Sequence, residues 1–281
     1  MGIGLAYRAR RWLWLVVAVV PCVAAAAAAQ YPAVTIPGSE VRTLSSSSTG
    51  RTYELYIRKP ADYDKAPQSK RPVLYLLDGQ WDFKLLDSVI GGLFYDKWMP
   101  DIMVVAITYP GAHPDYDALR AMDYTPTPGD RTGSGDGPKF LAFIKSELIP
   151  FVETQYHADP ARRILGGHSL GGLFTLYAMF SEPTLFWGYL AGSPAVTWDQ
   201  NFLPKQEEQF AHTHRELPVR LYLAVGGAEP LMDPAMSFAR TLAARHYEGL
   251  HWEGHVIEAE RHSGVKPEFY NRGLRFLFGR P

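Results

Sequence analysis

The chain has 281 residues, 47% of them hydrophobic and 20% charged, with a formal net charge of −1 at pH 7. Because the charge is near neutral and no block of Lys or Arg occurs, the sequence argues against a protein that binds nucleic acid or an anionic membrane surface. The only cysteine is Cys22. Once the segment around it is removed, a disulfide framework, a cysteine nucleophile and a thiolate metal site are all excluded.

Residues 1–29 have the pattern of a bacterial export signal. Three arginines lie between Arg8 and Arg11, an apolar stretch follows over Trp12–Val20, and Ala24–Ala29 offers small-residue cleavage sites. Cleavage would remove the three arginines and change the net charge to −4. An uncleaved anchor is the alternative, since no charge occurs between Trp12 and Ala29. The expected location is therefore periplasmic or secreted, with no membrane contact beyond this segment.

Residues 30–281 are predicted to form a single domain, because no repeat, low-complexity tract or linker interrupts them. Thr52–Ile57 alternates as a half-exposed antiparallel strand does. Pro72–Leu77 and Ile102–Thr108 are continuous apolar runs typical of strands buried on both faces. Phe83–Lys97 lies between these runs and suits a crossover helix, which gives a βαβ unit and a parallel sheet.

Tyr109–Pro138 is rich in Pro, Gly, Asp and Tyr and is predicted to be a long functional loop. Phe140–Tyr156 is predicted to be an amphipathic helix that Pro150 kinks. The remaining predicted elements alternate between strand and helix: Ala161–Leu165, Leu173–Phe180, Phe186–Ala191, Val219–Val225, Met236–Arg245, His251–Ile257 and Pro267–Phe278. This order favours an α/β domain with a mostly parallel central sheet and helices on both faces.

Gly166–Gly172 contains the pattern G-x-S-x-G, centred on Ser169. A predicted strand precedes it and a predicted helix follows it, which is the context of a nucleophile elbow. Side chains at Gly167 and Gly171 are expected to collide with this tight turn. The pattern therefore predicts that Ser169 is a nucleophile.

A serine nucleophile needs a base and a group that orients the base. In the α/β-hydrolase arrangement the chain order is Ser, then an acid, then His. Of the histidines after Ser169, only His262 lies in a polar loop between the last predicted strand and the last helix. Glu229 follows the strand Val219–Val225 and is the favoured acid. Asp233 is the main alternative, and a dyad without an acid also stays open.

An oxyanion hole needs two backbone N–H groups that point at the developing negative charge. One is expected to be the amide of Leu170, directly after the nucleophile. The other is expected in the turn Leu77–Trp81, where Gly79 lets the chain bend and Gln80 supplies the N–H. An ordinary strand-ending turn is the alternative interpretation of this segment.

Together these segments resemble the putative-esterase (esterase D-like) family of α/β-hydrolases. The resemblance extends from about Arg51 to Phe278, and its most specific marks are Tyr75–Gly79, Gly167–Phe174, Ala191-Gly192-Ser193-Pro194 and the loop of His262. It is closest to the exported enterochelin-esterase-like branch, which implies that Ser169, Glu229 and His262 are catalytic and that Leu170 and Gln80 supply the oxyanion amides. One departure is that the family often has His-Gly-Ser where this chain has His262-Ser263-Gly264.

Aromatic residues on loops after the strands are candidates to bind substrate, namely Trp81, Tyr124 and Trp198. Arg120 and Asp123 would either bind a charged substrate or pin the long loop by salt bridges, and we favour the second interpretation. No His and carboxylate cluster has metal-ligand spacing, and no phosphate loop occurs, so neither a metal nor a cofactor is expected.

The resemblance implies a serine carboxylic-ester hydrolase that acts through an acyl-enzyme on a small-molecule ester, of the siderophore type or another kind. Two alternatives have the same fold. One is an acyltransferase that uses the same serine, and the other is a non-catalytic binding module.

Overall fold

The computed structural model describes residues 1–2, 33–66 and 68–279. Apart from Met1 and Gly2, the predicted export signal and its Cys22 lie outside the described residues. The chain divides into two units, Met1–Thr35 and Ile36–Pro281, and the second of these contains the whole sheet. Within the described ranges, no helix has the length and apolar character needed to cross a membrane.

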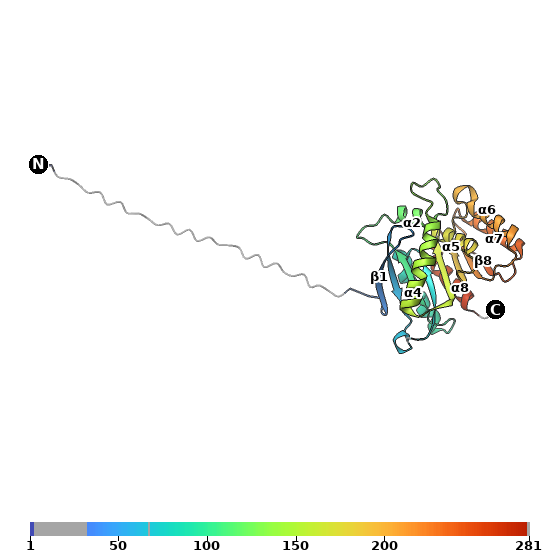
Figure 1. Ribbon diagram of the computed structural model, residues 1–281, viewed down its shortest axis with the longest axis horizontal. Coiled ribbons are helices and arrows are strands. Elements are labelled where there is room, and N and C mark those ends of the chain that lie inside the picture. Colours follow the sequence, from blue (N-terminus) through green and yellow to red (C-terminus); the bar gives the residue numbers. More distant parts are fainter. Residues whose placement is uncertain (3–32, 67, 280–281) are drawn as a thin grey trace. The chain divides into compact units, whose positions relative to one another are not determined.

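Ile36–Pro281 is built on one eight-stranded sheet with the strand order β1-β2-β4-β3-β5-β6-β7-β8. The strands are β1 (Ser39–Ser45), β2 (Thr52–Arg58), β3 (Arg71–Leu76), β4 (Met103–Thr108), β5 (Ala158–His168), β6 (Gly188–Gly192), β7 (Arg220–Gly226) and β8 (His251–Ile257). β2 is antiparallel to β1 and β4, and all other pairings are parallel. In Figure 1 the sheet runs from β1, in blue, to β8, in orange.

Helices cover both faces of the sheet. They are α1 (Gly79–Tyr95), α2 (Tyr116–Tyr124), α3 (Gly137–Phe143), α4 (Ile149–Tyr156), α5 (Leu170–Ser181), α6 (Trp198–Thr213), α7 (Met232–Arg245) and α8 (Lys266–Phe278), with a short 3₁₀ turn, η1 (Tyr63–Lys65), and a π-helical segment, η2 (Ile144–Leu148). The central strands alternate between two apolar clusters. In β3, Val73 and Tyr75 pack with α2 to α7, whereas Leu74 and Leu76 pack with α1 and α8.

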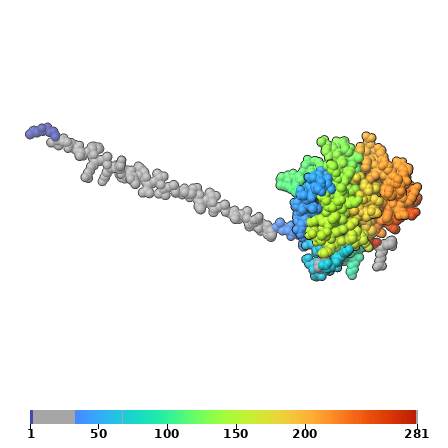
Figure 2. All heavy atoms as spheres, in the orientation of Figure 1, coloured from blue at the N-terminus to red at the C-terminus, as the bar shows by residue number. Residues whose placement is uncertain are grey.

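This arrangement confirms the predicted α/β-hydrolase fold and its mostly parallel sheet. The alternation in β3 follows from strand geometry, because successive side chains point to opposite faces. Since both faces are covered, β3 from Val73 to Leu76 and the whole of β4 are buried and apolar, as the continuous runs in the sequence indicated. In Figure 2 the visible face of this unit passes from blue and green segments to orange ones, which follows the strand order.

The segment Tyr109–Pro138 is not one long loop, as the sequence suggested. It contains the helix α2, which begins after Asp115, whose side chain accepts a hydrogen bond from the amide of Ala118 (3.1 Å). α2 buries the charged side chains of Arg120 and Asp123. A helix is usually predicted from apolar residues that recur on one face. Because charged residues occupy the buried face of α2, the sequence did not show this pattern.

Three other elements also differ from the predictions. β1 and α6 were not predicted. The helix predicted over Phe140–Tyr156 begins at Gly137 and contains the π-helical segment η2 directly before Ile149 and Pro150. Pro150 has no N–H to donate to the carbonyl of Ser146, so a regular α-helical hydrogen bond is missing at this point. A local π turn accommodates that defect.

Candidate active site

Ser169 lies at the junction between β5, which ends at His168, and α5, which begins at Leu170. Its backbone has φ 63° and ψ −118°, a strained conformation for a residue with a side chain. Besides the helical bond from Leu173 N to Ser169 O (2.9 Å), two backbone hydrogen bonds hold it there. Ser169 N donates to Gly192 O (2.9 Å), and Ala195 N donates to Ser169 O (3.2 Å). The strand–turn–helix context predicted for a nucleophile elbow is present.

Two glycines make room for this turn. A Cβ added at Gly167 would lie 2.6 Å from the carbonyl carbon of Gly171, and one at Gly172 would lie 2.7 Å from Gly192 O. At Gly171, by contrast, the nearest atoms would be at 3.5 Å, an ordinary contact distance. The expectation that Gly171 is sterically required is therefore wrong. Gly172 has that role, because α5 packs there against the backbone of the turn after β6.

His262 and Glu229 are hydrogen-bonded to each other. His262 Nδ1 lies 2.5 Å from Glu229 Oε2, and because a carboxylate only accepts, the proton of this bond belongs to the imidazole. The Glu229 side chain is 2% exposed, whereas that of His262 is 41% exposed. Asp233 lies exposed in the first turn of α7. The carboxylate beside His262 is thus that of Glu229, not that of Asp233.

The other carboxylate oxygen of Glu229 has two further donors. Glu229 Oε1 accepts hydrogen bonds from Ser193 Oγ (2.5 Å) and from the amide of Gly226 (2.7 Å). Burying a carboxylate costs free energy unless donors replace its hydration, and here three donors do so. Sequence reasoning missed Ser193 as a site residue, because nothing in its neighbourhood along the chain indicated a partner 36 residues away.

The turn after β3 lies beside the elbow, because Leu77 N donates to Gly166 O (2.9 Å). Leu170 and Gln80 occupy the first turns of α5 and α1, where backbone amides lack an acceptor within the helix. Such amides favour negative charge. The bend itself is made by Asp78, with φ 60°, and not by Gly79 as expected. Gly79 is needed for close approach, since its Cβ would lie 2.9 Å from Ala106 Cβ.

A buried ion pair lies under this turn. Arg120 Nε and Nη2 lie 2.5 and 2.9 Å from the two carboxylate oxygens of Asp78. Burial raises the pKa of Asp78, while the guanidinium of Arg120 opposes that shift. Asp123 pairs with Arg51 through one carboxylate oxygen, and its other oxygen accepts hydrogen bonds from the hydroxyls of Tyr53 and Tyr109. Of the two interpretations of Arg120 and Asp123, the structure supports the salt bridges that pin α2 and the segments around it.

Ser169, Leu170 and His262 line one hollow of about 810 Å³. The rest of its lining comes from two surface segments and from Leu231, the residue before α7. The two segments supply Pro128, Gly129, Asp130, Arg131, Ala195, Thr197, Trp198, Asp199 and Gln200. The two segments are tied together, since Trp198 Nε1 donates to Thr127 O (3.0 Å). Among the described residues, no hydrogen bond joins Ser169 Oγ to His262. Catalytic hydrogen bonds are often long before substrate binds.

The three predicted pocket aromatics lie in different surroundings. Trp198 lines the hollow. Trp81 is 42% exposed and does not line the hollow. The centre of its ring lies 5.0 Å from Arg120 Cζ and 5.9 Å from Lys266 Nζ. Tyr124 is fully buried, and its hydroxyl accepts a hydrogen bond from the amide of Asp78 (3.3 Å). Tyr124 is therefore a core residue, and its assignment to substrate binding was wrong.

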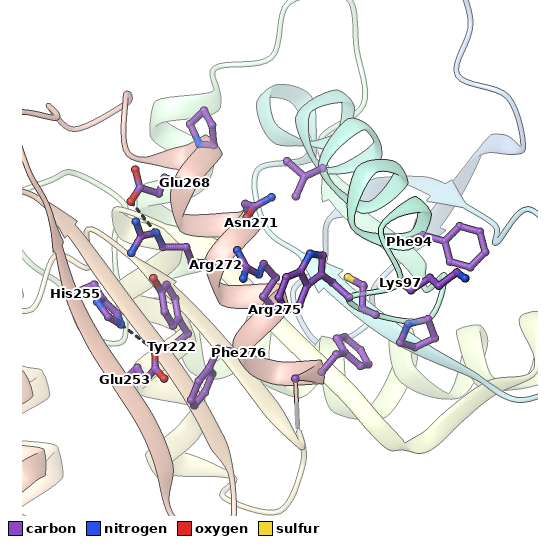
Figure 3. A pocket seen from close by; sticks show the side chains of 17 residues that line it. Phe94, Lys97, Tyr222, Glu253, His255, Glu268, Asn271, Arg272, Arg275 and Phe276 are labelled. Atoms are coloured by element: carbon purple, nitrogen blue, oxygen red, sulfur yellow. Dashed lines mark hydrogen bonds and ion pairs between the residues drawn. The ribbon is translucent and has the colours of Figure 1, made fainter. Parts of the chain in front are cut away.

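A larger hollow, of about 1480 Å³, lies along α8 between the end of α1 and β8 (Figure 3). Several of its charged groups pair with each other. Arg272 binds Glu268 (2.8 Å), and His255 binds Glu253 (2.8 Å). None of the predicted site residues lines it. Over the described part of the chain, no group of three or more His, Cys, Asp or Glu residues is arranged to hold a metal ion.

Comparisons with known proteins show the family to which this chain is related. The family described as Putative esterase matches residues 46–263. Ferri-bacillibactin esterase from Bacillus subtilis is 32% identical over 265 residues, which are 87% of this chain and 91% of that protein. The apo-salmochelin esterase of Escherichia coli is 33% identical over 141 residues, or 47% of this chain and 43% of that protein.

Solved structures of related proteins have the same fold as this chain. The BES protein from Bacillus cereus has a TM-score of 0.80 and 25% identity, covering 89% of this chain and 98% of that one. An IroE-like serine hydrolase from Shewanella oneidensis has a TM-score of 0.77 and 26% identity, covering 85% and 80%. The fold and the relatives together define a carboxylic-ester hydrolase. The chain belongs to the Putative esterase family.

Proposed function

We propose that this esterase cleaves its substrate through a covalent acyl-enzyme, with Ser169 as nucleophile, His262 as general base and acid, and Glu229 as the group that orients His262. The observation that carries the proposal is the 2.5 Å hydrogen bond between His262 and Glu229 at a hollow that Ser169 also lines. With Nδ1 engaged by Glu229, Nε2 is the ring nitrogen free to exchange a proton with the serine.

In the first half-reaction, Ser169 Oγ attacks the ester carbonyl carbon while His262 Nε2 takes the hydroxyl proton. The resulting tetrahedral intermediate carries a negative charge on the former carbonyl oxygen, which the amides of Leu170 and Gln80 stabilise. The intermediate collapses, the C–O bond to the leaving alcohol breaks, and His262 returns the proton to the departing oxygen. Glu229 stabilises the imidazolium that exists between these proton transfers.

In the second half-reaction a water molecule replaces the alcohol. His262 takes a proton from the water, and the resulting hydroxide attacks the acyl carbon. The bond to Ser169 Oγ then breaks, and the serine recovers its proton from His262. The products are one carboxylic acid and one free enzyme. Because each proton removed is returned, the cycle consumes only water and ester.

For the substrate, we propose a siderophore-type ester. Ferri-bacillibactin and apo-salmochelin esterases are named for substrates of this kind. A hollow of about 810 Å³ is large for a simple short-chain ester and suits a bulkier molecule. Its lining places the aromatic Trp198 and the charged Arg131 and Asp130 within reach of such a substrate.

We also propose that the enzyme acts after export, in the periplasm or outside the cell. This part rests on the sequence of residues 1–29, with its arginines, apolar stretch and small-residue cleavage sites. Mass spectrometry of the N-terminus of protein recovered from periplasm and culture medium tests it. An N-terminus near residue 30 is expected, and an intact Met1 on membrane-bound protein would contradict cleavage.

The triad is tested by replacing the nucleophile. Ser169→Ala should lower hydrolysis of a p-nitrophenyl ester by several orders of magnitude, on the order of 10⁶. Ser181→Ala, a change of the same kind at the exposed end of α5, should retain full activity. A fluorophosphonate probe should label one serine, identified as Ser169 by peptide mapping. Turnover retained by Ser169→Ala would overturn the proposal, and ester products formed with added alcohols would indicate acyl transfer.

A further inference from the structure

The end of β6 and the turn after it, Ala191-Gly192-Ser193-Pro194, contact both ends of the proposed triad. We propose that Ser193 is a positioning residue that holds Glu229 in the orientation His262 requires, and that this turn fixes the acid relative to the nucleophile. The inference rests on the proposed function, because it assigns a role through Glu229.

Ser193 holds one side of the carboxylate. Its side chain is fully buried, and its hydroxyl donates to Glu229 Oε1 (2.5 Å), which also accepts the amide of Gly226 (2.7 Å). The opposite oxygen, Oε2, faces His262 Nδ1. Rotation of the carboxylate would break both bonds at Oε1. Since hydrogen bonds to an ionised acceptor are stronger than neutral ones, the two donors fix the plane in which Glu229 meets the imidazole.

The backbone of Ser193 is adapted to this contact. Its φ is +38°, a conformation that residues with a side chain rarely adopt. Ser193 N donates to Ala224 O (2.7 Å) on β7, beside the register pair Gly192 and Ala224. Strained residues persist where their surroundings over-determine them, and they cluster at functional sites. Ser193 makes both the backbone bond to β7 and the hydroxyl bond to Glu229, so the strained backbone and the contact with the carboxylate are linked.

Gly192, directly before Ser193, and Ala195, two residues after it, hold the backbone of the proposed nucleophile. Gly192 O accepts the amide of Ser169 (2.9 Å), and Ala195 N donates to Ser169 O (3.2 Å). A side chain at Gly172 would meet Gly192 and Pro194. The turn therefore bonds to the backbone of Ser169 and to the side chain of Glu229, so that a shift of the turn would change the distance between nucleophile and base.

The test removes the hydroxyl in two ways, by Ser193→Ala and by Ser193→Gly. Glycine accepts a positive φ, so the second variant keeps the backbone conformation if alanine does not. In the full chain, both should lower kcat for ester hydrolysis by about ten- to a hundredfold, the effect of one hydrogen bond to a charged group. KM should change by less than about threefold, because the hydroxyl contacts no substrate.

Repeating the Ser193 substitution in a variant that already lacks the Glu229 carboxylate distinguishes a positioning role from a general structural role. In Glu229→Gln, the further change Ser193→Ala should cost less than about threefold, because its effect passes through the carboxylate that is already lost. Ser46→Ala is the matched control. Ser46 is also buried, and its hydroxyl donates to the carboxylate of Glu147 (3.2 Å), outside the site. That variant should keep the wild-type kcat.

Unchanged kcat in both Ser193 variants would overturn the inference, and so would the same loss in the wild-type and Glu229→Gln backgrounds. Failure of the triad itself gives a different result, namely activity retained by Ser169→Ala.

Discussion

The imidazole rings of His168 and His262 lie side by side, with centroids 4.5 Å apart and planes inclined by 51°. His168 is buried at the end of β5, directly before Ser169. Burial lowers the pKa of His168 to about 2, and the nearby charges of His262 and Lys266 act in the same direction. His168 is therefore neutral at any pH at which the enzyme would work, and it packs against His262 without adding charge.

The neutral state of His168 should make the fold sensitive to acid. In the unfolded chain a histidine binds a proton below about pH 6.5, whereas His168 in the folded protein stays unprotonated down to about pH 2. The unfolded state thus binds more protons, and stability falls as the pH is lowered through this window. From pH 7 to pH 5 this one residue should remove about 2 kcal/mol from the free energy of unfolding.

Urea denaturation of wild type and His168→Gln between pH 5 and pH 7 checks this value. Contributions of groups common to both proteins cancel in the difference between the two profiles. The variant should lose less stability on acidification than the wild type, and parallel profiles would contradict the prediction.

The identity of the acid can be decided with a pair of isosteric changes. Glu229→Gln should lower kcat/KM by about two to four orders of magnitude, because the amide no longer holds His262 in the tautomer that accepts the serine proton. Asp233→Asn should cost less than about threefold, since Asp233 is exposed on α7. Initial rates with a p-nitrophenyl ester measure both, and the reverse ranking would assign the acid to Asp233.

Two neighbouring glycines of α5 should respond differently to alanine. Gly172→Ala places a Cβ 2.7 Å from Gly192 O, and overpacking of this kind costs about 1–3 kcal/mol. Gly171→Ala meets only ordinary contacts and should leave stability unchanged or raise it by up to about 1 kcal/mol through helix propensity. Thermal and urea unfolding of both variants tests this contrast, and equal destabilisation would refute it.

The buried pair of Arg120 and Asp78 should be costly to break. Arg120→Met leaves the buried carboxylate without its partner and should lower the free energy of unfolding by about 3–5 kcal/mol. The double change with Asp78→Asn should cost less than Arg120→Met alone, since no unpaired charge remains. Arg272→Met, which breaks an exposed pair with Glu268, should cost less than about 1 kcal/mol in the same urea titrations.

Elements with strong local patterns could be predicted from the sequence. The strand His251–Ile257 has the predicted bounds, and the predicted helix Pro267–Phe278 differs from α8 by one residue. The turn around Ser169 was also recognisable, because its glycines and the flanking strand and helix lie within about 20 residues of each other. Local sequence fixes such features.

Features that depend on partners distant in sequence could not be predicted. Arg120 meets Asp78 42 positions away, and Ser193 meets Glu229 36 positions away. Tyr124 was predicted to bind substrate because it lies in a polar stretch, but α2 places its side chain in the core. The same aromatic residue types occur on substrate-binding loops and on short buried helices, and only the tertiary packing distinguishes the two cases.

The hollow beside Ser169 has walls that belong to none of the strands. One wall is Pro128–Arg131 and the other runs from Ala195 to Gln200, joined through the bond between Trp198 and Thr127. Ser169, His262 and Glu229, the proposed catalytic residues, all follow strand ends instead. Apart from Ala195, whose amide bonds to Ser169 O, we expect substitutions in the two walls to alter which ester is accepted more than they alter the rate of bond cleavage. Because of this division, natural variation or a designed library confined to about ten wall positions can change the accepted substrate while the residues proposed for catalysis stay the same.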